Sequence, residues 1–269
     1  MRVLIELPTW LGDTVMVTPS IESLIRRFNN TEITIIGSYA SIEILKYHPN
    51  VVEYFVIEKN YFKLYKLSKK IGKFDKFLSF RGSFRSTILK FFISGIDKFQ
   101  FQKSNYKNLH QVEKYSHFVN DSFGVNFPVE NLKIYSISDF NNKNKTKPII
   151  GMNPGASYGS SKRWPPQKFA KVAIELSSFY DIVIFGNSEE IEIGIEIEEK
   201  LLEKNIKNYQ NLIGKTTLED LIKHIKRLDL FLTGDSGPMH LAAAFQIPTV
   251  SIFGPTKVNE TSQWMNKKN

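Results

Sequence analysis

The feature of the sequence that most constrains the fold is a pattern of strand, loop and helix that begins at the N-terminus and starts again after residue 147. Residues 2–7 form an apolar run typical of a buried strand, and the apolar residues between 21 and 28 then repeat at helical spacing. The same signals predict strands at 32–37, 51–57, 148–152, 181–185, 229–233 and 249–253, and helices at 41–47, 166–177, 189–204, 217–226 and 238–245. Alternating strands and helices are typical of an α/β fold with a parallel sheet wound on both faces, so each half is predicted to be Rossmann-like.

A polar segment joins the two halves. Residues 138–147 read SDFNNKNKTK, a composition typical of a linker. The sequence therefore predicts one domain over residues 1–147 and a second over residues 148–269, with a cleft between them, and 269 residues are enough to bury two hydrophobic cores. The chain ends soon after residues 253–256, before a further helix can cover the second sheet, so we expect a truncated C-terminus.

The excess positive charge lies in the first predicted domain. Residues 1–147 carry 22 Lys and Arg against 13 Asp and Glu, whereas residues 148–269 carry 14 of each. Between Lys59 and Lys107, 13 basic residues accompany only Asp75 and Asp97. This imbalance predicts an anionic partner, the alternative being a solvated lysine-rich surface. Nucleic acid is not the expected partner, because no helix-turn-helix, RNA-recognition or zinc-finger pattern organises the basic residues.

Several classes of protein are disfavoured by what the sequence lacks. There is no cysteine, which excludes disulfides, iron–sulfur clusters and thiolate zinc sites and is compatible with a reducing compartment. Glu6 and Pro8 interrupt the apolar N-terminal run, which therefore does not resemble a secretory signal. No apolar stretch approaches the roughly 20 residues that a membrane-spanning helix needs. We expect a cytoplasmic protein whose contact with a membrane, if any, is peripheral.

The first candidate site is the loop that leaves the first strand, residues 7–13, LPTWLGD. In doubly wound sheets, ligands bind at the carboxyl ends of the strands, which is where this loop lies. Gly12 permits a tight turn, and Asp13 then falls near the start of the next helix, where backbone N–H groups favour its ionised form. Asp13 is therefore a candidate general base, the alternative being that it only caps the helix.

The second candidate site is the segment 153–165, NPGASYGSSKRWP. A Gly- and Ser-rich loop that follows a strand, ends in Lys162 and opens into a helix has the features of a phosphate site. An ordinary surface loop is the alternative. The spacing does not fit a P-loop, and the chain contains no G-x-G-x-x-G fingerprint, so neither an ATPase nor an NAD enzyme is indicated.

The third candidate site is the segment 233–240, TGDSGPMH. A strand delivers Asp235, Ser236 or Gly237 can cap the next helix, and Pro238 suits its first turn, so the N–H groups of this helix are expected to hold a diphosphate. His240 is a secondary candidate, because a lone helical histidine is more often packed than catalytic. The five histidines show no metal-ligand spacing and no Asp-x-Asp pair occurs, so no metal site is expected.

Taken together, these motifs resemble the ADP-heptose:lipopolysaccharide heptosyltransferases. The resemblance rests on L-P-x-W-L-G-D-x-V-M-x-T-P, N-P-G-A-x-x-x-x-S-K-R-W-P and T-G-D-S-G-P-M-H-L-A-A-A followed by I-F-G-P-T, and it is strongest to the heptosyltransferase II branch. It implies a GT-B-like fold, with the acceptor bound by the first domain and ADP-heptose by the second.

The resemblance also implies roles for individual residues. Asp13 matches the family's base, Lys162 its diphosphate-binding lysine and Asp235 its donor-heptose contact. Further donor contacts are implied at Ser236, Gly237, Pro238 and His240, at Glu189 or Glu190 for the ribose, and at residues 214–217 for the adenine; acceptor contacts are expected at Trp10, Arg81 and Arg85. The two arginines follow a strand of the basic domain, and arginine suits a phosphate- or acid-bearing acceptor through its bidentate fork.

The implied reaction is a single inverting displacement that needs no cofactor and no metal. Asp13 deprotonates a hydroxyl on the first heptose of the lipopolysaccharide inner core, and this hydroxyl attacks the L-glycero-D-manno-heptose of ADP-heptose while ADP leaves. Two alternatives remain at this stage. One is heptosyltransferase I, which acts on the acidic core sugar, and the other is a non-catalytic nucleotide- or sugar-binding module.

Overall fold

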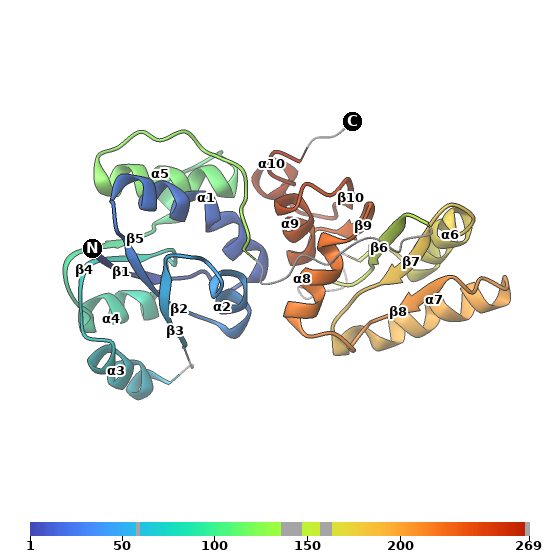
Figure 1. The fold of residues 1–269 in the computed structure, drawn as a ribbon, viewed down its shortest axis with the longest axis horizontal. Coiled ribbons are helices and arrows are strands. Elements are labelled where there is room, and N and C mark those ends of the chain that lie inside the picture. Colours follow the sequence, from blue (N-terminus) through green and yellow to red (C-terminus); the bar gives the residue numbers. More distant parts are fainter. Residues whose placement is uncertain (58–59, 136–146, 157–162, 267–269) are drawn as a thin grey trace. The chain divides into compact units, whose positions relative to one another are not determined.

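The computed structural model describes residues 1–57, 60–135, 147–156 and 163–266 (Figure 1). It divides into two compact units, Met1–Ile137 and Ser138–Asn269. Residues 138–146 of the expected linker lie outside the described residues. Each unit contains a five-stranded parallel sheet with helices between its strands, which confirms the predicted α/β class.

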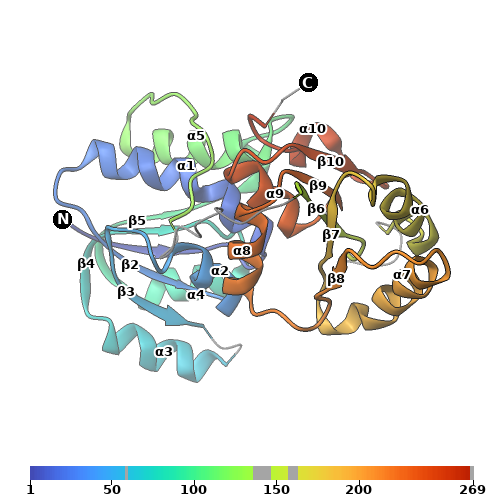
Figure 2. The same ribbon diagram turned by 45° about the vertical axis from the view of Figure 1, so that its right-hand side comes forward.

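The first unit follows the predicted alternation and continues it beyond the elements that the sequence patterns assigned. Its elements are β1 (Arg2–Glu6), α1 (Leu11–Arg27), β2 (Glu32–Gly37), α2 (Tyr39–Leu45), β3 (Val51–Val56), α3 (Tyr61–Lys70), β4 (Lys73–Ser79), α4 (Phe84–Phe92), β5 (Ser94–Gln100), η1 (Lys103–Asn105) and α5 (Gln111–Phe123). The strand order is β3-β2-β1-β4-β5. In both ribbon views α1 and α5 lie side by side on one face of the sheet, and α3 and α4 lie on the other (Figures 1 and 2).

Apolar side chains from the strands and from α3 and α4 form the core on one face of the first sheet. Leu4 and Phe77 from adjacent strands are fully buried there, together with Leu64 of α3 and Leu89 of α4. On the other face, α1 accommodates Pro19 within its length. Proline has no N–H to donate to the carbonyl of Val15, and the Thr18 hydroxyl donates to that carbonyl instead, at 2.8 Å.

A half-buried carboxylate ties the end of the first unit to α1. Glu22 accepts hydrogen bonds from His48 at 3.1 Å and from the Tyr135 hydroxyl at 3.0 Å, and its other oxygen lies 3.3 Å from the Lys133 ammonium. Burial alone would raise the pKa of Glu22, but these three partners outweigh it and lower the pKa from 4.5 to about 2. The ionised carboxylate is therefore stabilised by the fold.

We expect acid to destabilise the first unit through this group. Because the folded pKa of Glu22 lies below the unfolded value, its contribution to stability is complete above about pH 4.5 and is lost as the pH falls towards about 2. Glu22→Gln should lower the free energy of unfolding by about 1.5–3 kcal/mol at neutral pH and flatten its pH dependence in this window. Urea unfolding at several pH values measures both effects, with the exposed Glu53→Gln as control; equal curves for the two variants would contradict the assignment.

The second unit repeats the architecture with its own sheet. Its elements are β6 (Ile149–Asn153), α6 (Pro166–Leu176), β7 (Asp181–Ile184), η3 (Ser188–Glu190), α7 (Ile191–Glu203), β8 (Tyr209–Asn211), α8 (Leu218–Lys226), β9 (Leu230–Gly234), α9 (Gly237–Ala244), β10 (Thr249–Ile252) and α10 (Val258–Thr261). The strand order is β10-β9-β6-β7-β8, and every neighbouring pair is parallel.

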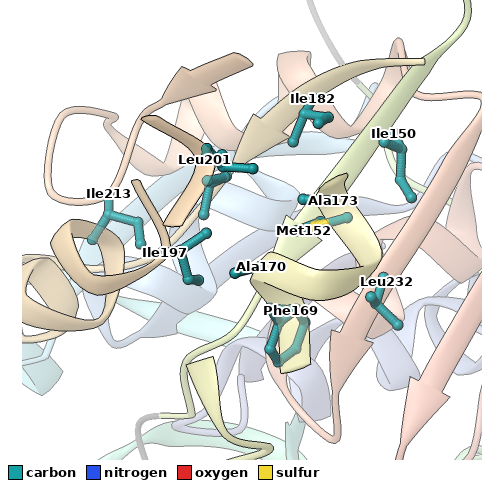
Figure 3. Packing of buried hydrophobic residues seen from close by; sticks show 11 residues of the cluster. Ile150, Met152, Phe169, Ala170, Ala173, Ile182, Ile197, Leu201, Ile213 and Leu232 are labelled. Carbon is teal, nitrogen blue, oxygen red and sulfur yellow. The ribbon is translucent and has the colours of Figure 1, made fainter. Parts of the chain in front are cut away.

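The core of the second unit lies between its sheet and the helices α6 and α7. Figure 3 shows Phe169 and Ala173 of α6 and Ile197 and Leu201 of α7 close to the strand residues, of which Met152 lies at the centre of the sheet. All five side chains are almost completely buried. This packing fixes the positions of β6 and β7 in the second unit. Among the described residues, no helix is both long and apolar enough to cross a membrane.

Candidate functional site

The candidate residues of the first unit lie in two loops at one edge of its sheet. The strand order places β2 on one side of β1 and β4 on the other, so the direction of winding reverses between β1 and β4. In doubly wound sheets, ligands bind at the carboxyl edge at such a point. The loop after β1 carries Trp10 and leads to Asp13 in the first turn of α1. The loop after β4 carries Arg81 and leads to Arg85 in the first turn of α4.

Asp13 lies in the first turn of α1, where the sequence predicted it. The N-cap position is occupied by Trp10, whose indole is exposed and whose carbonyl accepts hydrogen bonds from the backbone N–H and the hydroxyl of Thr14, both at 3.0 Å. The Asp13 carboxylate accepts a hydrogen bond from the Tyr115 hydroxyl, which in turn accepts one from the Gln111 amide. The Tyr115 side chain of α5, 102 residues further along the chain, thus positions the Asp13 carboxylate. A residue that only caps its own helix does not need such a contact.

Two aromatic rings pack against Tyr115. Its ring lies 5.5 Å from that of Phe80 and 5.0 Å from that of Phe101, and it is buried between them. Burial first, and then the negative charge of Asp13, raise the pKa of Tyr115 well above its usual range, so its hydroxyl remains protonated and can donate to Asp13. Sequence reasoning missed Tyr115, because no local pattern connects it to Asp13.

We expect Tyr115→Phe to lower kcat about tenfold and to move the acidic limb of the pH–rate profile to higher pH. The Asp13 carboxylate loses a donor that favours its ionised form and fixes its orientation, while the phenylalanine ring preserves the packing. The profile should be compared with that of Tyr106→Phe, which removes a hydroxyl that donates to a different carboxylate, Asp121, at 2.8 Å. Identical profiles for the two variants would show that Tyr115 does not position Asp13.

A buried carboxylate organises the loop after β4. Glu6, the last residue of β1, accepts hydrogen bonds from the hydroxyls of Ser79 at 2.6 Å and Ser86 at 3.0 Å, and its carboxylate lies 3.7 Å from the Arg81 guanidinium. Burial raises the pKa of Glu6, while the two hydroxyls and the nearby charges of Arg81 and Arg85 act in the opposite direction. The sequence signal for this role is an acidic residue that directly follows the apolar residues 3–5 at the end of the strand.

Two arginines, Arg81 and Arg85, lie near the single carboxylate of Glu6. Burial and the like charge of Arg81 lower the pKa of Arg85, although a guanidinium stays protonated at neutral pH. The loop itself is held by Gln100, whose amide donates to the carbonyls of Arg81 and Ser83, both at 3.2 Å. Such an excess of positive charge, fixed at a strand end, suits an anionic group of a ligand.

In the second unit, the winding direction reverses between β6 and β9. The loop after β9 carries Asp235, which is buried at the end of the strand and whose N–H donates to Ile252 in β10 at 3.2 Å. Ser236 occupies the N-cap position of α9, as the sequence allowed, but its hydroxyl pairs with Thr233 at 3.1 Å and does not cap the helix.

The start of α9 is formed by Ser236, Gly237 and Pro238. Gly237 begins the helix and Pro238 lies in its first turn, as predicted. Pro238 has no N–H, and the N–H of Met239 donates to the carbonyl of Ser236 at 3.1 Å. The positive end of the helix dipole, with the N–H groups of Ser236 and Gly237, is therefore the feature that suits a phosphate group. His240 is buried within the same helix, which agrees with a packed histidine.

The structure distinguishes the two glutamates proposed for the donor site. Glu189 is exposed, whereas Glu190 is only 3% exposed and its carboxylate accepts from the N–H of Asn187 at 2.9 Å. A Cβ placed on Gly155 would lie 2.0 Å from the Glu190 carboxyl group, and one on Gly186 would lie 2.8 Å from it. Glu190 therefore joins the loops after β6 and β7. Burial raises its pKa, against the effects of the Asn187 N–H and the charge of Arg163.

Gly155→Ala should be disruptive because of this contact. The added methyl group overlaps the Glu190 carboxyl, which cannot move without giving up its bond to Asn187, so we expect a loss of about 1–3 kcal/mol in the free energy of unfolding of the second unit. A double-mutant cycle with Glu190→Ala measures the coupling. The cost of Gly155→Ala should shrink in the Glu190→Ala background, and an undiminished cost would contradict the proposed overlap.

Lys162 lies outside the described residues. The residues on either side of that gap are described: Asn153 donates to the carbonyl of Gly155 at 3.2 Å, and the Arg163 guanidinium donates twice to the carbonyl of Ala156, at 3.1 and 3.3 Å. The segment 214–217, expected near the adenine, contains Gly214 with φ +71° and Thr217 as the N-cap of α8. Within the described part of the chain, no group of three or more His, Cys, Asp or Glu side chains could hold a metal ion.

Comparison with known proteins identifies relatives of the whole chain. The model of glycosyltransferase family 9 (heptosyltransferase) matches residues 64–269. A lipooligosaccharide heptosyltransferase 2 of Campylobacter jejuni is 41% identical over 275 residues, which cover 99% of this chain and 85% of the relative.

Solved structures share the fold. The E. coli ADP-heptose heptosyltransferase II matches with a TM-score of 0.82 at 24% identity. The match covers 98% of this chain and 88% of that chain. The E. coli heptosyltransferase WaaC with ADP matches with a TM-score of 0.81 at 17% identity. This match covers 98% of this chain and 91% of that chain. These likenesses confirm the expected fold class, with two Rossmann-like domains of the GT-B kind.

Proposed function

Because this chain belongs to glycosyltransferase family 9, the heptosyltransferase family, we propose that it transfers L-glycero-D-manno-heptose from ADP-heptose to the first heptose of the lipopolysaccharide inner core. The observation that carries this proposal is the similarity, over nearly the whole chain, to the heptosyltransferase 2 of Campylobacter jejuni. The second unit binds the donor and the first unit binds the acceptor and supplies the base.

The donor diphosphate is bound at the start of α9. The Ser236 side chain does not cap this helix, and the helix dipole favours the negative charge that grows on the leaving ADP. Lys162 adds a positive charge, and Asp235 accepts hydrogen bonds from hydroxyl groups of the transferred heptose. Of the two glutamates, Glu189 is exposed and can contact the ribose, while Glu190 supports the loops beneath it. In this mechanism, backbone and lysine charges stabilise the diphosphate and no metal is needed.

The acceptor hydroxyl is activated at the start of α1. Asp13, oriented by Tyr115, removes the proton as the hydroxyl attacks the anomeric carbon, and the carbon–oxygen bond to ADP breaks in the same displacement. The new linkage therefore has the opposite anomeric configuration to the donor. Arg81 and Arg85 contact anionic groups of the acceptor, and the exposed Trp10 packs against its sugars. We further propose that the enzyme works in the cytoplasm, in peripheral contact with the inner membrane.

Acceptor assays test the proposal and its alternatives together. The chain should be incubated with ADP-heptose and either a core that carries one heptose or a core that carries none, with and without a chelator. We expect ADP release with the first acceptor only, unchanged by the chelator. Turnover restricted to the heptose-free core would indicate heptosyltransferase I activity, and binding of ADP-heptose without turnover on either core would indicate a non-catalytic module.

A further inference from the structure

Helices α3 and α4 carry an exposed aromatic and basic surface that the proposed chemistry does not use. Phe62 and Phe91 are 63% and 82% exposed, and Tyr65 is also exposed. Three of the rings are in contact across the two helices, since Tyr65 lies 5.3 Å from Phe92 of α4 and Phe92 lies 5.9 Å from Phe91, and Phe62 lies one turn before Tyr65 on α3. We call Phe62, Tyr65, Phe91 and Phe92, with the surrounding lysines, the α3–α4 surface.

The lysines of this surface are interleaved with its rings. The Lys66 ammonium lies 4.6 Å from the centre of the Phe62 ring and the Lys69 ammonium lies 5.4 Å from that of Tyr65. Helix α3 has four lysines and no acidic residue; its basic residues are Lys63, Lys66, Lys69 and Lys70, all exposed. The buried face of α3 is formed instead by Leu64 and Ser68, so the exposed rings are surplus to the core.

These features fit an anionic membrane surface. Large apolar rings flanked by lysines, on helices that pack side by side, are what peripheral proteins insert at the boundary between headgroups and acyl chains (Figure 1). Lysines add attraction to anionic lipids over about a Debye length. Neighbouring exposed aromatic side chains, of which Phe91 is 82% exposed, are typical of an interaction surface.

The position of the surface is consistent with access to an acceptor carried by a lipid. Both helices begin at the carboxyl edge of the first sheet, the edge at which Arg81 and Arg85 also lie. The proposed acceptor contacts therefore lie at the end of the sheet where the two helices of the α3–α4 surface begin. We propose that this surface docks the enzyme on an anionic bilayer; the inference rests on the proposed function, whose acceptor is anchored in a membrane.

Vesicle sedimentation tests this inference with two double variants, Phe62→Ser/Phe91→Ser and Lys66→Gln/Lys69→Gln. The parent chain should sediment with phosphatidylcholine vesicles that contain about one-third phosphatidylglycerol, and not with phosphatidylcholine alone. The vesicle-bound fraction of each double variant should be lower than that of the parent by about tenfold or more. The matched controls Phe179→Ser and Lys168→Gln/Lys171→Gln, exposed residues of the second unit, should bind as the parent does.

The outcomes separate this inference from the proposed function. Equal sedimentation of parent and double variants, or failure of the parent to bind anionic vesicles, would overturn the docking surface. So would binding of single-stranded oligonucleotides, in place of vesicles, that depends on Phe62 and Phe91. Activity on a delipidated core should be unchanged in both double variants. A parent that binds vesicles through this surface but does not use that core would leave the docking surface standing and remove the transferase activity.

Discussion

Asp13→Asn is expected to lower kcat by about 10²- to 10⁴-fold while ADP-heptose still binds. Asparagine has nearly the same shape as aspartate and can still accept a hydrogen bond from Tyr115, but it cannot take up the proton of the acceptor hydroxyl. In the proposed mechanism the second unit binds the donor, so ADP-heptose binding should persist. Single-turnover kinetics and calorimetric titration with ADP-heptose measure the two steps separately.

The control for Asp13→Asn is Asp121→Asn, which also removes a carboxylate from the first unit but at the Tyr106 contact on α5. That variant should turn over at the parent rate. If Asp13→Asn turned over normally, Asp13 would have no part in proton transfer; if it also lost ADP-heptose binding, its role would be structural.

Asp235→Asn is expected to lower kcat/KM for ADP-heptose by about 10²- to 10³-fold. Asp235 is buried at the end of β9, directly before the start of α9, and in the proposed mechanism its carboxylate accepts hydrogen bonds from hydroxyl groups of the donor heptose. An amide replaces one acceptor oxygen by a donor and leaves a substrate hydroxyl poorly paired. Initial rates at varied ADP-heptose concentration give this quantity.

Asp181→Asn provides the matched control for Asp235→Asn. Asp181 begins β7 and so lies at the opposite, amino-terminal edge of the same sheet. Its replacement should leave kcat/KM unchanged. If Asp235→Asn had the kcat/KM and the unfolding midpoint of the parent, Asp235 would not contact the donor sugar.

The winding of both units could be predicted from the sequence, because their strands are short apolar runs separated by helical periodicity. The predicted strand at 32–37 is β2 (Glu32–Gly37), and the predicted helix at 217–226 is α8 (Leu218–Lys226) with Thr217 as its cap. The region from α3 to α5 was not assigned in this way. There the aromatic residues and lysines of α3 and α4 lie on exposed faces, so their pattern does not separate a buried side from a solvated one.

The candidate site could be predicted only where a residue's role depends on its own loop. The starts of α1 and α9 lie where Gly12 and Pro238 indicated. The contacts that distinguish Glu190 from Glu189, or connect Tyr115 to Asp13, come from chain segments far apart in sequence. Such contacts depend on tertiary packing, which local propensity and spacing do not specify.

The most direct test of the transferase mechanism is the fate of the heptose itself. The enzyme should be incubated with ADP-heptose and a core oligosaccharide that carries one heptose, in the presence of a chelator, and the anomeric protons followed by NMR. We expect one heptose to be attached for each ADP released, with the anomeric configuration inverted relative to the donor. Retention of that configuration, or ADP release without attachment of heptose, would contradict a single displacement assisted by Asp13.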